Sequence, residues 1–203
     1  MSTPQTPELH NLFIQMSGAP GSGKSTIAAR LGRRINGVVI DHDVFRSSLI
    51  ESGIPFEQAA KCAYRLQWAQ AQHMIKQGLN VIVDSTCNYQ DIVDRGSALA
   101  KQHDYTYWYI ECRVQDVDLL DQRLRARDPM TSQRTGVDRP PAAAADTADA
   151  ESGHNAAQDS RALFKKWIES PFRPKHHVVV VDSTRGPDIL QDEIVKQITG
   201  GME

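Results

Sequence analysis

The sequence contains little of what secreted, membrane-spanning or metal-clustered proteins require. It has only three cysteines, Cys62, Cys87 and Cys112. Because they are widely spaced and odd in number, they form neither a C-x-x-C metal motif nor a disulfide framework. No apolar run approaches the roughly 18 residues of a membrane span. The opening stretch, MSTPQTPELHN, lacks the apolar core of a secretory signal. These absences predict a cytoplasmic protein in a reduced setting, without a membrane partner.

The sequence also lacks an excess of charge of either sign. Its 23 Lys and Arg residues stand against 25 Asp and Glu residues, which gives a formal net charge of −2. This balance argues against a protein that mainly coats nucleic acid, although it is compatible with a local basic groove. A chain of 203 residues is long enough for one domain with a substantial core, so we expect a single domain over residues 1–203.

One stretch carries a specific motif. The residues GAPGSGKS, from Gly18 to Ser25, match the phosphate-binding (Walker A) pattern G-x-x-x-x-G-K-[ST] and lie between an apolar run and a helix-compatible segment. Glycines let the backbone N–H groups turn inward toward phosphate oxygens, and the following helix adds its positive end. We expect Lys24 to reach the β- and γ-phosphates and Ser25 to hold Mg²⁺. The predicted nucleotide-binding residues are Gly18, Ala19, Pro20, Gly21, Ser22, Gly23, Lys24, Ser25 and Thr26.

Short apolar runs alternate with helix-compatible segments along the chain. Strands are predicted at 12–16, 38–40, 81–83, 106–112 and 178–181, and helices at 24–35, 44–51, 56–76, 90–102, 114–127, 159–169 and 189–198. The wholly apolar run at 38–40 is typical of a strand buried on both faces. The alternation predicts an α/β fold, with a parallel sheet covered by helices on both faces and ligands at the carboxyl ends of its strands.

The composition changes at Asp128. From there to about residue 158, bulky apolar residues are almost absent and Pro, Gly, Ala and small polar residues dominate. This composition predicts a flexible lid or insertion over 128–158 within the single domain. Alanine favours helix, so Ala142 to Ala145 could form a short helical piece inside it.

Acidic residues follow three of the five predicted strands. Asp84 ends the strand at 81–83, where it could hold Mg²⁺ with Ser25 or could instead cap the next helix. Asp43 follows the second strand, and Arg46 lies three residues later on the same helical face. Asp43 could accept the proton of an attacking hydroxyl or could be a helix cap, and Asp41 is the rival base. His42 lacks partners at metal-ligand spacing, so we expect an oriented or exposed histidine.

Other polar residues complete the predicted site. Thr86 and Asn88 could contact an acceptor or simply shape a turn. Arg123 and Arg127, four residues apart, would stabilise the transferring charge together or else be solvated at a helix end, whereas Arg125 would point away. Two further arginines in this stretch, Arg134 and Arg139, are weaker candidates. Arg185 follows the last strand, where it could pack against a nucleotide base.

Four motifs together resemble one group of P-loop kinases. These are GAPGSGKST, D-x-x-R at Asp43–Arg46, V-D-S-T-x-N at Val83–Asn88 and R-x-x-x-R at Arg123–Arg127. They are similar to the kinases grouped with phage-type polynucleotide 5′-hydroxyl kinase, with chloramphenicol phosphotransferase and the zeta toxins as more distant relatives. The resemblance covers residues 12–127 well and the last strand and helix loosely. It implies a strand order of 2-3-1-4-5, Asp43 as general base, Arg46 on the acceptor and Arg127 on the transferring phosphate.

The departures from that group bear on the acceptor. The 128–158 segment is longer than the polynucleotide kinase lid and acidic and Ala-rich rather than basic, and no phosphatase domain follows. We therefore expect an ATP- and Mg²⁺-dependent kinase that acts on a hydroxyl of a small, nucleoside- or nucleotide-like molecule. The alternatives are a polynucleotide 5′-hydroxyl kinase and, in another class, a nucleotide-binding switch or accessory NTPase. The sequence does not specify the oligomeric state.

Overall fold

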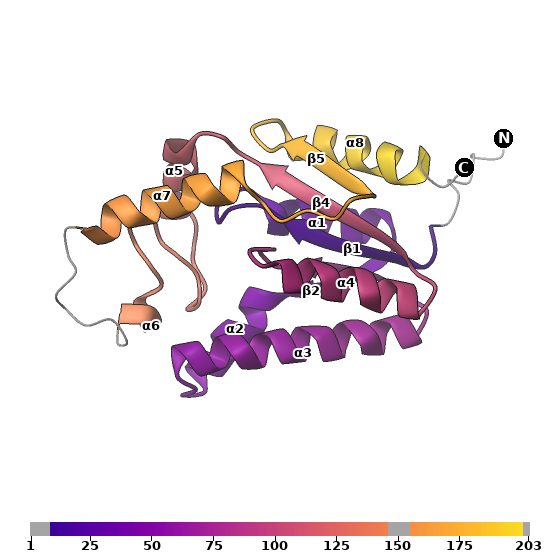
Figure 1. Ribbon diagram of the computed structural model, residues 1–203, viewed down its shortest axis with the longest axis horizontal. Helices are drawn as coiled ribbons and strands as arrows, with labels where there is room; N and C mark the ends of the chain where they lie inside the picture. The colour runs from indigo at the N-terminus through magenta and orange to yellow at the C-terminus, as the bar shows by residue number, and fades with distance from the viewer. Residues whose placement is uncertain (1–8, 146–154, 201–203) are drawn as a thin grey trace.

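Five parallel strands form a single sheet in the computed structural model, which describes residues 9–145 and 155–200 (Figure 1). The order across the sheet is β2-β3-β1-β4-β5, and every neighbouring pair is parallel. The predicted fold class and strand order are confirmed. The strands are β1 (Leu12–Ser17), β2 (Gly37–Asp41), β3 (Asn80–Asp84), β4 (Thr106–Arg113) and β5 (Val178–Asp182).

Helices cover both faces of this sheet (Figure 1). Helices α1 (Lys24–Arg34) and α8 (Pro187–Gly200) pack on one face, and α3 (Phe56–Lys76) and α4 (Gln90–Gln102) pack on the other. The remaining helices lie toward the carboxyl ends of the strands: α2 (His42–Glu51), α5 (Val117–Ala126), α6 (Ala142–Ala145) and α7 (Asn155–Glu169). Within the described part of the chain, no helix is long and apolar enough to span a membrane.

The central strand β1 joins the two halves of the core. All six of its residues are buried, and alternate side chains point to opposite faces. Leu12, Ile14 and Met16 pack with α1 and α8, whereas Phe13 packs with α3 and α4. Gln15 is the polar exception, and its amide is paired at both ends: it donates to the Ile92 carbonyl and accepts from the Tyr107 hydroxyl. The sheet therefore provides a rigid base for the loops at its carboxyl edge.

The prediction of a second strand buried on both faces was only partly right. In β2, Ile40 is buried, but Val38 and Val39 are half-buried. The reason is position, because β2 is an edge strand with a neighbour on one side only. An apolar run in the sequence does not distinguish the edge of a parallel sheet from its centre.

Two helix boundaries differ from the prediction in ways that affect the site. Helix α2 begins at His42, because the Asp41 carboxylate accepts from the Asp43 N–H and caps the first turn. Helix α5 begins at Val117 behind an Asp116 cap and ends at Ala126. Arg127 therefore lies in extended backbone after the helix and not on its face.

Residues 127–141 pack against the body of the protein. Val137 is 1 % exposed and joins a third apolar cluster with Leu120 and Leu124 of α5 and Phe164 of α7. Part of the predicted lid, residues 146–154, lies outside the described residues, so its flexibility stays a prediction. The tetrapeptide at 142–145 is helical, as its alanines allow.

The segment that leads from α7 to β5 is fixed to the sheet. Glu111 of β4 is 2 % exposed and accepts two hydrogen bonds from the Arg173 guanidinium, at 2.6 and 2.8 Å. The Tyr109 hydroxyl donates to the Phe172 carbonyl at 2.7 Å. A buried carboxylate requires such a partner, and these bonds hold residues 172–173, just beyond α7, against β4.

Candidate active site

A cavity of about 880 Å³ opens at the carboxyl ends of the strands. It is bordered by the phosphate loop, α2, the start of α3, the β3–α4 loop, residues 127–144, α7 and the loop after β5. Most of the predicted site residues line it: Pro20, Gly21, Ser22, Gly23, Lys24, Ser25, Thr26, Asp43, Arg46, Asp84, Thr86, Asn88, Arg123, Arg127 and Arg185. Gly18 and Ala19 are not among the lining residues and lie at the start of the loop. The structure thus brings together residues that are up to 165 positions apart in sequence, from Pro20 to Arg185.

The phosphate loop has a backbone that only its glycines can adopt. Gly18 has a φ of +133°, and a Cβ there would lie 2.3 Å from the Cys112 carbonyl oxygen. Gly23 has a φ of +88° immediately before α1. The Lys24 ammonium donates to the carbonyls of Gly18 and Ala19, at 3.0 and 3.1 Å. Its charge is therefore held over the loop at the N-terminus of α1, where phosphate oxygens are favoured.

Asp84 has the features of a magnesium ligand. It is 3 % exposed, and burial raises the pKa of its carboxyl, while the charge of Lys24 and a hydrogen bond from Ser25 lower it. Its Oδ2 atom has no hydrogen-bond partner in the described part of the chain. The capping alternative is excluded, because Tyr89 precedes α4 and no side chain caps that helix. A buried, unpaired carboxylate oxygen beside a hydroxyl fits Mg²⁺.

Asp41 lies beside Asp84 at the carboxyl ends of paired strands. Burial, together with the charge of Asp84, raises the pKa of Asp41 to about 7. The described residues contain no group of three or more His, Cys, Asp or Glu side chains that could hold a metal ion by themselves. A cation bound at Asp84 would therefore need oxygens from a nucleotide as well.

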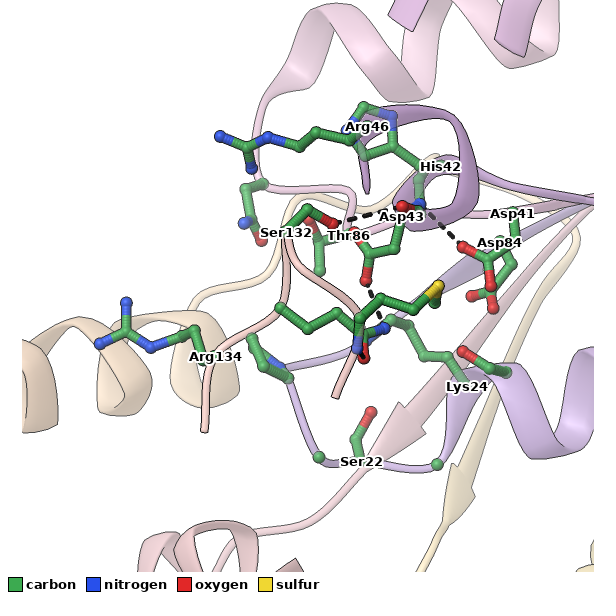
Figure 2. Close-up of a pocket in the computed structure, with 18 of the residues that line it drawn as sticks. Ser22, Lys24, Asp41, His42, Asp43, Arg46, Asp84, Thr86, Ser132 and Arg134 are labelled. Carbon is green, nitrogen blue, oxygen red and sulfur yellow. Dashed lines mark hydrogen bonds between the residues drawn. The ribbon is translucent and has the colours of Figure 1, made fainter. Parts of the chain in front are cut away.

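Asp43 lies in the first turn of α2 and faces the cavity (Figure 2). Its Oδ2 accepts a hydrogen bond from Gln133 Nε2 at 2.9 Å. Burial lowers the pKa of Arg46 and of Arg127, and the charge of Asp43 acts on both in the opposite direction. The cap of α2 is Asp41 and not Asp43. Both carboxylates line the cavity, and Asp41 also uses one oxygen to cap α2, so Asp43 as the base stays a prediction.

His42 and Arg46 border the cavity along α2. The His42 ring is 7 % exposed and lies 4.2 Å from the Tyr64 ring, and burial lowers the pKa of His42 to about 4. It is therefore neutral at physiological pH, and its contact with Tyr64 orients the ring. The Arg46 guanidinium lies 3.9 Å from the Phe56 ring centroid. Aromatic and cationic groups thus lie next to each other on this wall.

The three arginines at the end of α5 differ in whether they line the cavity. Arg123 lines the cavity and donates to the Ser183 carbonyl at 2.9 Å, and Arg127 lines it and donates to the Arg134 carbonyl at 2.8 Å. Arg125 points away, as predicted, and pairs with Asp121 and Asp138.

The other two predicted arginines of the 128–158 segment also differ in position. Arg134 borders the cavity, but its guanidinium donates to the Val137 carbonyl at 2.7 Å, and Figure 2 shows it directed away from Asp43. Arg139 is not a lining residue. After the last strand, Arg185 lines the cavity and forms a 2.7 Å ion pair with Glu193.

Several lining residues were not predicted from the sequence. Phe56, Tyr64 and Trp167 contribute aromatic surface, and Ser132 and Gln133 contribute hydrogen bonds to α2. One signal could have identified the α2 contacts. Ser47 and Glu51 are polar and follow Asp43 at intervals of four residues, which places them on the same helical face as this predicted base.

Comparison with known proteins gives a family and a set of similar folds. A family profile described as AAA domain matches residues 13–150, about two thirds of the chain. No curated protein matches the sequence significantly. A proposed kinase from Chloroflexus aurantiacus has a similar structure, with a TM-score of 0.66 at 16 % identity, covering 95 % of this chain and 99 % of that one.

Two further structures are similar. The APS kinase of Mycobacterium tuberculosis, in complex with AMPPNP and APS, has a TM-score of 0.59 at 16 % identity, covering 94 % of this chain and 98 % of that one. A gluconokinase from Sinorhizobium meliloti has a TM-score of 0.57 at 14 % identity, covering 93 % and 92 %. At these identities, the likeness concerns the fold alone.

Proposed function

We propose that this chain, which belongs to the AAA domain family, is an ATP-dependent kinase that transfers the γ-phosphate to a hydroxyl of a small molecule. The observation that carries the proposal is the placement of Asp43. Its carboxylate and the Lys24 phosphate loop border the same cavity, and they follow β2 and β1, which lie on either side of β3. A nucleotide on the loop and an acceptor on α2 would therefore meet between them. The kinase names of the structural neighbours agree with this reading through fold alone.

Each group in the cavity has a role in such a transfer. Asp43 accepts the proton as the acceptor oxygen attacks the γ-phosphorus, and the bond from that phosphorus to the β–γ bridging oxygen breaks to release ADP. Lys24, Arg123 and Arg127 stabilise the negative charge on the transferring group. Arg46, Thr86 and Asn88 contact the acceptor, and Arg185 packs against the base of the nucleotide.

The donor set around Asp84 fits a magnesium ion. Ser25 and Asp84 would hold Mg²⁺, which supplies positive charge to the phosphate oxygens when bound. The fit rests on the unpaired Oδ2 of Asp84 and on the neighbouring Ser25 hydroxyl.

The acceptor side of the cavity favours a small molecule with a flat apolar part. The rings of Phe56, Tyr64, Tyr89 and Trp167 border the cavity, and Phe56 and Tyr64 lie next to Arg46 and His42; rings of this kind stack on nucleobases. A volume of about 880 Å³ is within the range of small-molecule sites. A nucleoside- or nucleotide-like acceptor is therefore our leading substrate class, and a polynucleotide 5′-hydroxyl end is the second.

The test is a γ-phosphate transfer assay with labelled ATP and Mg²⁺. The acceptor panel contains adenosine, thymidine, gluconate, glycerol and a 5′-hydroxyl oligonucleotide, and the Asp43→Asn variant is the control. Label on a nucleoside, lost in the control, is the expected result. Label on the oligonucleotide alone would replace the small acceptor with a polynucleotide. Free phosphate alone, undiminished in the control, would show an accessory NTPase and overturn the kinase proposal.

A further inference from the structure

We propose that Gln133 is a positioning residue that orients the carboxylate of Asp43 for proton transfer. This inference rests on the proposed kinase function and deepens it. It assigns a role to a residue that lies far from every nucleotide-binding motif in the sequence. Its basis is a hydrogen bond of 2.9 Å from Gln133 Nε2 to Asp43 Oδ2, between residues 90 positions apart.

The amide of Gln133 is fixed at both ends. The side-chain Oε1 of Gln133 accepts from the Met130 N–H at 3.2 Å, and its Nε2 donates to Asp43. In addition, the backbone N–H of Gln133 donates to the Met130 carbonyl at 2.8 Å. Since Oε1 is occupied by a backbone donor, Nε2 is the end that must face Asp43. Residues 130–133 thus form a closed turn that points an N–H at the predicted base.

The same turn is attached to one face of α2. The Ser132 N–H donates to Ser47 Oγ at 3.1 Å, the Ser132 hydroxyl donates to the Asp43 carbonyl, and the Thr131 hydroxyl donates to Glu51 at 2.6 Å. Ser47 and Ser132 are both about 4 % exposed, so their bonds are shielded from water. Because the contacts run along positions 43, 47 and 51, the turn cannot shift without breaking several bonds together.

A neutral donor suits a general base. Arginine beside a carboxylate forms a charge-assisted pair, which holds the carboxylate strongly and reduces its tendency to take a proton. The amide of Gln133 holds Oδ2 without adding charge, so Oδ1 can be directed at the acceptor hydroxyl. The role is one of geometry, and a misplacement of about 1 Å at such a group can cost about 100-fold in rate.

The experiment uses two substitutions of Gln133, of which Gln133→Glu also brings a negative charge next to Asp43 and Gln133→Met does not. Gln133→Glu keeps an oxygen for the Met130 N–H but removes the donor that faces Asp43, whereas Gln133→Met removes both. The matched control is Gln90→Glu, because Gln90 also donates to an aspartate, Asp94, at 2.8 Å, but on the exposed surface of α4. Transfer is measured with labelled ATP and whichever member of the panel of adenosine, thymidine, gluconate, glycerol and 5′-hydroxyl oligonucleotide the wild-type chain labels best.

We expect both Gln133 variants to lower kcat for transfer by about 10- to 100-fold. The KM for ATP and the melting temperature of Gln133→Met should stay near wild type, and Gln90→Glu should change none of these quantities. A kcat within twofold of wild type in both Gln133 variants would overturn the positioning role and leave the kinase proposal intact. So would an equal loss of kcat and ATP affinity with a lowered melting temperature, which marks a purely structural residue. Absence of transfer by the wild-type chain would overturn the kinase proposal itself.

Discussion

The two sides of the cavity are built in different ways. The phosphate side comes from one stretch, and its Lys24 contacts span only five and six residues, to Ala19 and Gly18. The acceptor side joins α2 to the 130–133 turn through bonds that span 80 to 90 residues, such as those from Ser132 to Ser47 and from Gln133 to Asp43. The bonds of Lys24 are therefore local in sequence, whereas those of the 130–133 turn join segments that are distant in sequence.

This contrast indicates how substitutions should affect the two sides of the cavity. The loop is constrained at each position, because Gly18 has no space for a Cβ and Lys24 must return to the loop carbonyls. The acceptor side depends on contacts between separate segments, and a change in one segment alters the position of another. A substitution should therefore affect nucleotide chemistry on the first side and acceptor chemistry on the second.

The largest effect should follow from Lys24→Ala, which removes the cation from the phosphate side. We expect transfer and any ATP hydrolysis to fall together by about 1,000-fold, because a charged donor to the phosphates is lost. The measurement is kcat/KM for ATP, with Lys101→Ala on the exposed end of α4 as control. Retained turnover in Lys24→Ala would refute the assignment of the phosphate loop.

On the acceptor side, Asp43→Asn should lower transfer by about 100- to 10,000-fold, the range of general-base catalysis. The amide is isosteric and can still accept from Gln133, so the fold should be retained. ATP affinity, measured by titration calorimetry, should stay near wild type because Asp43 faces the acceptor. An equal loss of ATP affinity would place Asp43 on the metal instead and remove the contrast between the two sides.

Two arginines sharpen the comparison, since they are close in sequence but differ in location. Arg127→Ala should lower kcat by about 100-fold, because its guanidinium borders the cavity near Asp43. Arg125→Ala should leave kcat within about threefold, because Arg125 pairs with Asp121 and Asp138 outside the cavity. Steady-state kinetics of both variants decide the matter. Equal losses would indicate that the α5 terminus acts as one structural unit.

The last prediction concerns stability and pH and leaves both sides of the cavity unchanged. Burial lowers the pKa of His42 to about 4 in the folded protein, below the ordinary value of 6.5 for histidine. The unfolded state therefore binds more protons between those values, and this contribution to stability is present above pH 6.5 and lost as the pH falls to 4. The loss should be on the order of 3 kcal/mol. Urea unfolding at pH 7 and pH 4 should show a smaller difference for His42→Phe than for wild type. Equal pH dependence would mean that His42 is not the titrating group.

Local signals made the fold and the phosphate side predictable. Strand ends followed apolar runs, as at Val83-Asp84, and the glycine spacing marked the loop. The half-burial of Val38 was not predictable, because strand position depends on neighbours distant in the chain. Likewise, nothing in the small polar residues of 128–158 distinguished Gln133 from its neighbours. Its role follows from the approach of that turn to α2, which only the tertiary structure provides.

The bonds from Glu111 to Arg173 and from Tyr109 to Phe172 have a mechanical consequence for α7. They hold the chain just beyond the C-terminal end of the helix, and nearer its start Arg161 pairs with Asp118 of α5. Because α7 is attached at both places, it should move only together with β4 and α5, and Trp167 should keep its place on the cavity wall while ligands enter and leave.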